Sequence, residues 1–115
     1  MTMSEASNIL SIVADRNAQL ELIYILTKKM LQMAAQREWE NVSKLEVERS
    51  HLIYSFFETK PSTEEAERIA NAILDVLTVD KKIMALSVSE RQKVVEKSQE
   101  INRGKLASKA YAMST

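Results

Sequence analysis

The chain has 115 residues, the length of one ordinary domain. It contains no cysteine, which excludes a disulfide, a thiolate nucleophile and a cysteine-ligated metal, and its 16 basic and 16 acidic residues give a net charge of zero. This balance argues against a general electrostatic affinity for nucleic acid or anionic lipid. The longest apolar run, residues 22–26, is far shorter than the roughly 20 residues that cross a bilayer, so we expect a cytosolic protein without membrane insertion.

The sequence predicts few and long helices, because it has one glycine, one proline and many straight-chain helix formers. Apolar residues recur at helical spacing from about residue 4 to residue 35, with Ser4 as the expected N-cap, and this predicts the first helix. The apolar phase shifts at Gln36 and Arg37, where we place a tight turn. One continuous helix through residue 58 is the alternative.

The second expected helix runs from about residue 38 to residue 59 and contains the only tryptophan, the only histidine and both phenylalanines. Leu45, Arg49 and Leu52 form a seam that we expect to pack on the first helix, with a structural role. Trp39 is also expected to be structural, because a tryptophan at this position can cap the end of the bundle. The side chains expected beneath it across the turn are Met30, Met33 or Ala34.

Arg49 occupies a seam position where a leucine would be expected, and two interpretations remain open. In the first, its stem packs on the seam while its head reaches water or a carboxylate of the first helix, such as Asp15 or Glu21. In the second, its guanidinium is buried, tolerates few partners and therefore fixes the register between the first two helices.

The residue inventory argues against an enzyme and against a metal site. One histidine, no cysteine and no glycine-rich loop do not supply a nucleophile, a base and a group to orient them. Glu48 and His51 form one Glu-x-x-His pair, whereas a di-iron helical bundle needs two such pairs and two further glutamates. We therefore expect a solvated surface pair and no cofactor.

The start of the third helix has a clear local signal. Pro61 disfavours helix at the preceding residue, and Ser62 with Glu65 forms the pattern of a capping box. The apolar stripe of this helix is dense at first and thins beyond Leu86. Asp80 is a candidate break, as are Ser87 and Ser89. The strongest stop signal is Gly104, after which a short terminal helix is expected.

These elements predict an all-α fold, an antiparallel helical bundle of three long helices plus a short C-terminal helix. We expect residues 1–103 to form the bundle and residues 104–115 to form a C-terminal helical tail. Tyr111 is the only aromatic residue after position 57, so this tail is either disordered or docked through that side chain. The third helix extends past what its shorter partners can cover, which leaves a hydrophobic strip either for a partner's helix or for another copy in a self-associating scaffold.

Three stretches carry a resemblance to a known family: REWENVSKLEVERSHLI from residue 37, KPST from residue 60 and NRGKLASKAY from residue 102. They resemble the FliT family of flagellar export chaperones, whose members share a W-x-x-V/L-x-x-L-E-x-x-R-type second helix and a basic tail ending in Ala-Tyr. Family members often carry a glycine where this chain has Arg37.

The resemblance implies a noncatalytic cytosolic chaperone for the filament-cap protein FliD. Such a chaperone binds the C-terminal segment of FliD, prevents its premature assembly and brings it to the export gate protein FlhA. Some family members also bind the regulator FlhDC or the export ATPase complex. The resemblance further implies a hydrophobic cleft on the second and third helices, over which the last helix folds as a lid. The residues that it assigns to partner contact are Phe57, Ile73, Leu77, Ile83 and Met84, and those of the regulatory tail are Leu106 and Tyr111.

Overall fold

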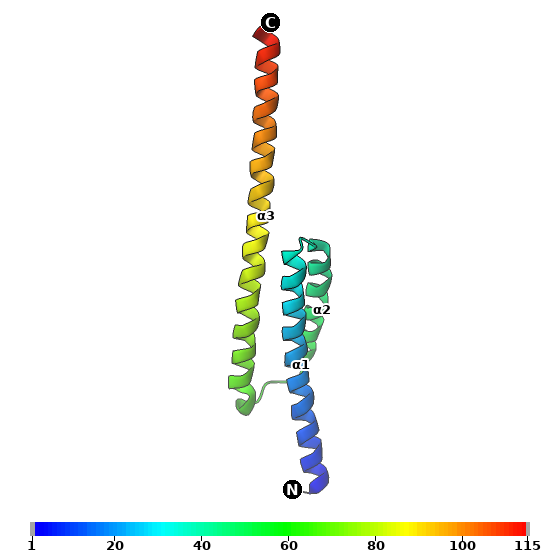
Figure 1. The fold of residues 1–115 in the computed structure, drawn as a ribbon. Helices are drawn as coiled ribbons and strands as arrows, with labels where there is room; N and C mark the ends of the chain where they lie inside the picture. The colour runs from blue at the N-terminus through cyan, green and yellow to red at the C-terminus, as the bar shows by residue number, and fades with distance from the viewer. Residues whose placement is uncertain (1, 115) are drawn as a thin grey trace. The chain divides into compact units, whose positions relative to one another are not determined.

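The computed structural model describes the backbone of residues 2–114 and the side chains of residues 2–7 and 14–113. These residues form α1 (Met3–Ala35), α2 (Trp39–Glu58) and α3 (Ala66–Ser114), with a single 3-10 turn, η1 (Thr63–Glu65), before α3 (Figure 1). The described part of the chain contains no strand, so the all-α expectation is confirmed. The chain divides into two compact units, Met1–Ile83 and Met84–Thr115, and each is described by itself below.

Helix α1 begins with a capping box two residues before its expected cap. Thr2 is the N-cap: its hydroxyl accepts a hydrogen bond from the Glu5 amide at 3.2 Å, and its own amide donates to Glu5 Oε2 at 3.1 Å. Ser4, the expected N-cap, lies inside the helix and that assignment is wrong. Both residues are good capping types, but only Thr2 has a glutamate three residues later.

The expected turn at Gln36 and Arg37 is confirmed, and the alternative of one continuous helix through residue 58 is wrong. The α1 C-terminus forms a Schellman motif, in which the Glu38 amide donates to the Met33 carbonyl at 2.9 Å and the Arg37 amide donates to the Ala34 carbonyl at 3.0 Å. Arg37 closes this motif with a φ of 63°, in the left-handed region that favours glycine.

The capping box predicted after Pro61 is confirmed. The Glu65 amide donates to Ser62 Oγ at 3.3 Å, and the Ser62 amide donates to Glu65 Oε1 at 3.0 Å. These bonds satisfy backbone donors that have no partner inside the helix that follows. They fix the point at which the chain turns from α2 into α3.

Helix α3 is continuous to Ser114, so the candidate breaks at Asp80, Ser87 and Ser89 and the separate short terminal helix after Gly104 are wrong. A glycine inside a helix costs only about 1 kcal/mol relative to alanine. The residues after Gly104 include lysine, leucine and alanine, which are strong helix formers. A single glycine in such surroundings weakens the helix without ending it.

The core of the first unit joins all three helices. Ile23 of α1, Phe56 of α2 and Ile69 of α3 form a buried cluster. Side chains packed around it are Leu20, Leu52, Ile53 and Val76. Among the described residues, the backbones of α1 and α2 approach each other closely, whereas the backbone of α3 stays farther from both. The first part of α3 therefore contacts this hairpin through side chains. Trp39 and Leu45 are half-buried, and their structural roles stay predictions.

Candidate functional site

An apolar groove lies in the first unit between the α1–α2 hairpin and the first part of α3. The residues that line it are Leu20, Ile23, Arg49, Ile53, Phe57, Ile69, Ala72, Ile73, Val76, Leu77 and Asp80. Its volume of about 230 Å³ lies below the range of pockets that enclose a small organic molecule. An open apolar groove of this size suits the side chains of another helix.

The rim of the groove is formed by apolar side chains that water reaches. Phe57 of α2 is 43% exposed, and Ile73 and Leu77 of α3 are 44% and 48% exposed. Phe57 packs edge-on against the buried ring of Phe56, with 5.1 Å between ring centroids. Because Phe56 is fully buried, this contact supports the Phe57 ring at the groove.

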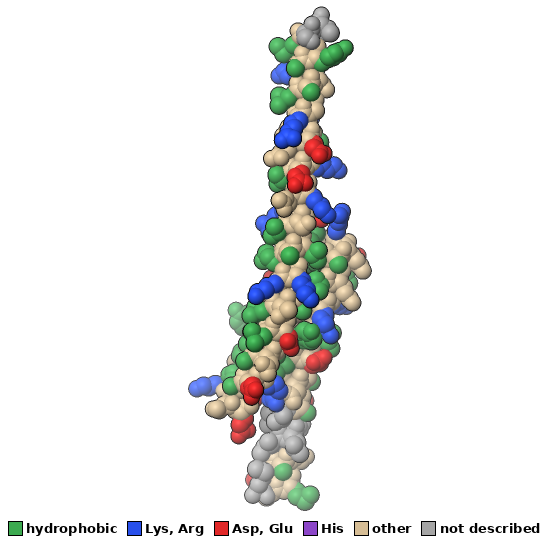
Figure 2. Space-filling model, turned by 60° about the vertical axis from the view of Figure 1, so that its left-hand side comes forward, with side chains coloured by type: hydrophobic (Ala, Val, Ile, Leu, Met, Phe, Trp, Pro, Cys, Tyr) green, Lys and Arg blue, Asp and Glu red, His purple; other side chains and the backbone are tan. Residues whose placement is uncertain are grey.

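Three of the five residues assigned to partner contact therefore line one groove: Phe57, Ile73 and Leu77. Ile83 is half-buried and is not among the lining residues. Met84 belongs to the second unit, where it is exposed. The tail residues Leu106 and Tyr111 also lie in the second unit, on α3, with exposed side chains. Figure 2 shows hydrophobic side chains interspersed with charged ones along α3.

Arg49 connects α2 to both other helices at one end of the groove. Its Nη1 donates to Asp80 Oδ1 of α3 at 2.7 Å and to Thr27 Oγ1 of α1 at 3.2 Å. The Thr27 hydroxyl is fully buried and donates to the Ile23 carbonyl, so its oxygen is oriented to accept from Arg49. The carboxylate that binds Arg49 is thus on α3, so the first interpretation, in which the head reaches water or a carboxylate of α1 such as Asp15 or Glu21, is wrong about the partner. A role in fixing the register stays a prediction.

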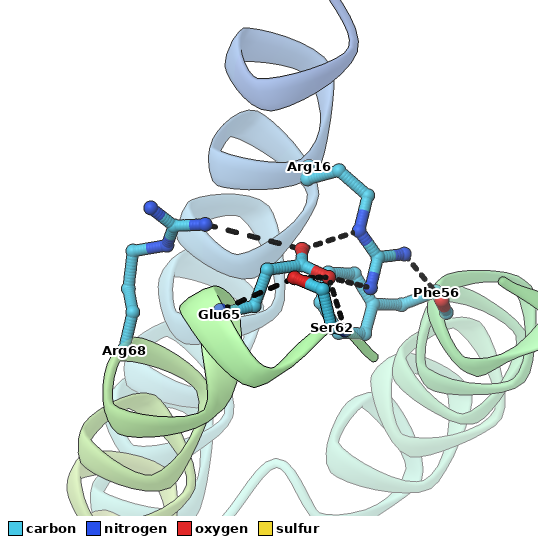
Figure 3. Close-up of polar contacts among 5 residues, drawn as sticks. All are labelled: Arg16, Phe56, Ser62, Glu65 and Arg68. Carbon is cyan, nitrogen blue, oxygen red and sulfur yellow. Dashed lines mark hydrogen bonds and ion pairs between the residues drawn. The ribbon is translucent and has the colours of Figure 1, made fainter. Parts of the chain in front are cut away.

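A second arginine, which the sequence reasoning missed, connects α1 to η1, the turn that leads into α3 (Figure 3). Arg16 is buried, and its Nε and Nη2 donate to the two carboxylate oxygens of Glu65 at 2.7 and 3.3 Å. Its Nη1 donates to the Phe56 carbonyl at 2.7 Å, and its guanidinium lies 3.8 Å from the centre of the Phe56 ring. Arg68 Nη2 approaches the same carboxylate at 3.9 Å. A charged residue four positions before Leu20, inside an apolar stripe, was the available signal.

The contacts of Glu65 lower its pKa from an ordinary value of 4.5 to about 2. The largest cause is the hydrogen bond from the Arg16 guanidinium, followed by the hydrogen bond from the Ser62 amide. Glu65 is therefore ionised at any physiological pH, and the ion pair with Arg16 persists throughout that range.

The two ion pairs lie beyond either end of the apolar part of the groove along α3. Glu65 precedes the lining residues of this helix, and Asp80 is the last of them. A helix rises about 1.5 Å per residue, so the backbone positions of Glu65 and Asp80 are offset by roughly 22 Å along the helix axis, or about four turns. Between them the lining of α3 is entirely apolar, and the hairpin is held to α3 at both ends.

The Glu-x-x-His pair lies on the surface of α2, as expected. Glu48 and His51 are both exposed, and the described residues include no cluster of three or more acidic or histidine side chains that would hold a metal ion. No described helix is long and apolar enough to cross a bilayer.

A comparison with protein-family models matches residues 17–113 to "Flagellar protein FliT", which covers both units. No curated protein and no solved structure matches the chain. The matched range begins one residue after Arg16 and includes every residue that lines the groove, the Arg49–Asp80 ion pair and nearly all of α3. The chain therefore belongs to the FliT family of flagellar export chaperones.

Proposed function

We propose that this protein is a cytosolic chaperone of flagellar type III export that binds the C-terminal segment of the filament-cap protein FliD. By holding this segment it prevents premature assembly of FliD, and it delivers FliD to the export apparatus through the gate protein FlhA. The observation that carries the proposal is the apolar groove with its exposed rim of Phe57, Ile73 and Leu77, found in a member of a chaperone family.

The groove suits a helical client for a physical reason. Ile73 and Leu77 are four residues apart on one face of α3, and Phe57 faces them from α2, so a helix laid between them would bury all three. Each side chain is nearly half exposed, and covering the rest of a phenylalanine, isoleucine or leucine contributes roughly 1 kcal/mol. Several such contacts give affinity without requiring a deep pocket.

The proposal is tested by calorimetric titration of the full chain with the C-terminal segment of FliD from the same genome. We expect a one-to-one complex. Leu77→Glu places a charge in the groove and should weaken binding at least about tenfold. Leu22→Glu is the matched control, because Leu22 is 44% exposed on α1 and does not line the groove. Absence of a complex, or equal weakening by both variants, would contradict the proposal.

We assign the C-terminal tail, residues 104–115, a regulatory role as a lid in which Leu106 and Tyr111 cover the groove in a resting state. The support is that both side chains are exposed on α3. Such a lid requires α3 to open well before Gly104, because Gly104 follows Asp80 by 24 residues, or about 36 Å of helix. Deleting residues 104–115, or Tyr111→Ala, should then strengthen binding to at least one partner. The partners to compare are FliD, FlhA, the export ATPase complex and FlhDC. Equal affinity of the unaltered and the altered chain for all of these partners would contradict the proposed lid.

A self-associating scaffold is the second candidate function. It is favoured by apolar side chains of α3 in the second unit that are exposed, namely Val88, Val94, Val95 and Ile101. A scaffold of this kind would be a dimer at low micromolar concentration, whereas the chaperone should be monomeric there without its client. Light scattering across a concentration series separates the two.

A further inference from the structure

Charge is confined to one place in the lining of the groove. Of the lining residues, only Arg49 and Asp80 are charged, and they lie together at the end of the groove away from Glu65. A partner helix that fills the groove therefore meets apolar side chains along most of its length and an ion pair at one end.

The two members of this ion pair are not equally accessible. The Arg49 side chain is 13% exposed and is bound to both Thr27 and Asp80, whereas the Asp80 side chain is 33% exposed. Arg49 donates to Oδ1 of Asp80, and a carboxylate has two oxygens with about four positions for accepting hydrogen bonds. The group that an incoming helix meets at this end is thus an anionic acceptor with remaining capacity.

We propose that Asp80 determines the specificity of the groove by selecting amphipathic helices whose apolar face ends in a lysine or arginine. This proposal rests on the proposed function. Asp80 follows Leu77 by three residues and Ile73 by seven, so it continues the same face of α3. The basic residue of the partner therefore lies three or four positions from the apolar residue that packs on Leu77.

Acidic and apolar residues are disfavoured at the position of the partner helix that lies beside Asp80. A carboxylate would lie beside the more accessible member of the Arg49–Asp80 pair, and Arg49, which is 13% exposed and already bound to Asp80 and Thr27, would offset little of the repulsion. An apolar side chain would remove water from the accessible part of Asp80 without replacing its hydrogen bonds. A basic side chain both replaces those bonds and adds charge attraction, so Asp80 discriminates against both alternatives.

The test uses the full chain to select displayed helical peptides of about 18 residues, which are longer than the roughly three turns of α3 that line the groove from Ile69 to Asp80. One parallel selection uses Leu77→Glu, which blocks the groove, and another uses Asp80→Asn, which keeps the size of the side chain and removes its charge. We expect the unaltered chain to enrich apolar helices with lysine or arginine at one position. Leu77→Glu should lose these peptides, and Asp80→Asn should keep the apolar pattern but lose the basic preference.

The outcomes separate this inference from the proposed function. Apolar helices that are lost with Leu77→Glu but show no basic preference would overturn the role of Asp80 and leave the groove as the binding site. No enrichment of any amphipathic helix on the unaltered chain would overturn both. A basic preference that survives in Asp80→Asn would overturn the assignment to Asp80.

The affinities of a selected peptide and its variant then show whether Asp80→Asn acts on recognition or only on the fold. Exchanging its basic residue for glutamine should weaken binding to the unaltered chain about tenfold and binding to Asp80→Asn hardly at all. Asp80→Glu should restore the preference. If Asp80 only stabilises the fold, both peptides lose affinity equally in Asp80→Asn, and that result would contradict the proposal.

Discussion

Arg37 holds the α1–α2 turn in a conformation that its side chain disfavours, and replacing it with glycine should stabilise the first unit. Its φ of 63° is left-handed, and this conformation costs a residue with a Cβ roughly 1–2 kcal/mol. Glycine removes that cost, but it also gives the unfolded chain more freedom, which offsets about 0.4–1 kcal/mol. The net difference between glycine and alanine at this position is therefore about 1 kcal/mol in favour of glycine.

Arg37→Ala is the matched control, because it removes the same side chain and its contacts while keeping the Cβ. For a unit of this size, about 1 kcal/mol corresponds to a difference in Tm of roughly 4–8 °C. Thermal and urea unfolding followed by circular dichroism should place Arg37→Gly above Arg37→Ala by this amount. Equal stability of the two variants, or a more stable alanine variant, would refute the assignment of a left-handed turn to this residue.

Further predictions concern the ion pair, the groove and α3. Because folding lowers the pKa of Glu65 from 4.5 to about 2, its contribution to stability is fully present above pH 4.5 and is lost as the pH falls toward 2. Acid titration of Glu65→Gln should show a flatter loss of stability over that window than the unaltered chain, and identical curves would count against the Arg16 contact. Leu77→Glu should weaken binding of the FliD segment at least about tenfold while Leu22→Glu leaves it unchanged, as calorimetry will show. Gly104→Ala should stabilise α3 by up to about 1 kcal/mol in urea unfolding, since nothing lies within 4 Å of an added Cβ; a destabilised variant would show that the glycine is needed.

Local signals predicted the boundaries of the helices well where a side chain acts on its own backbone. Pro61, Ser62 and Glu65 lie within five residues of one another, and the geometry that they specify is the geometry found. The turn at Arg37 was predicted from the apolar phase alone. Its left-handed φ was not predictable in the same way, because the residue present is not the one that this conformation favours.

Signals carried by a single residue failed where the neighbouring residues decide the outcome. Gly104 is a strong stop signal by itself, yet the helix formers that follow it outweigh the cost of one glycine. Ser4 is a good N-cap type, but Thr2 gains a second hydrogen bond through Glu5. Each failure is a competition between two local preferences whose difference is small.

The partners of the buried arginines were beyond sequence reasoning. Arg49 was recognised because it interrupts a seam, but its carboxylate, Asp80, is 31 residues away and became its partner only through the packing of α3. Arg16 interrupts the stripe of α1 in the same manner and binds Glu65, 49 residues away. Such pairs depend on which helix faces are brought together, and one sequence does not specify this.

The central claim is that the groove lined by Phe57, Ile73 and Leu77 holds the C-terminal segment of FliD. Its most direct test is photo-crosslinking with a photoreactive phenylalanine analogue placed singly at position 57, at position 73 or, as a control outside the groove, at position 22. We predict adducts to the C-terminal segment of FliD from positions 57 and 73 and none from position 22. Adducts from position 22 without any from the groove would contradict the claim.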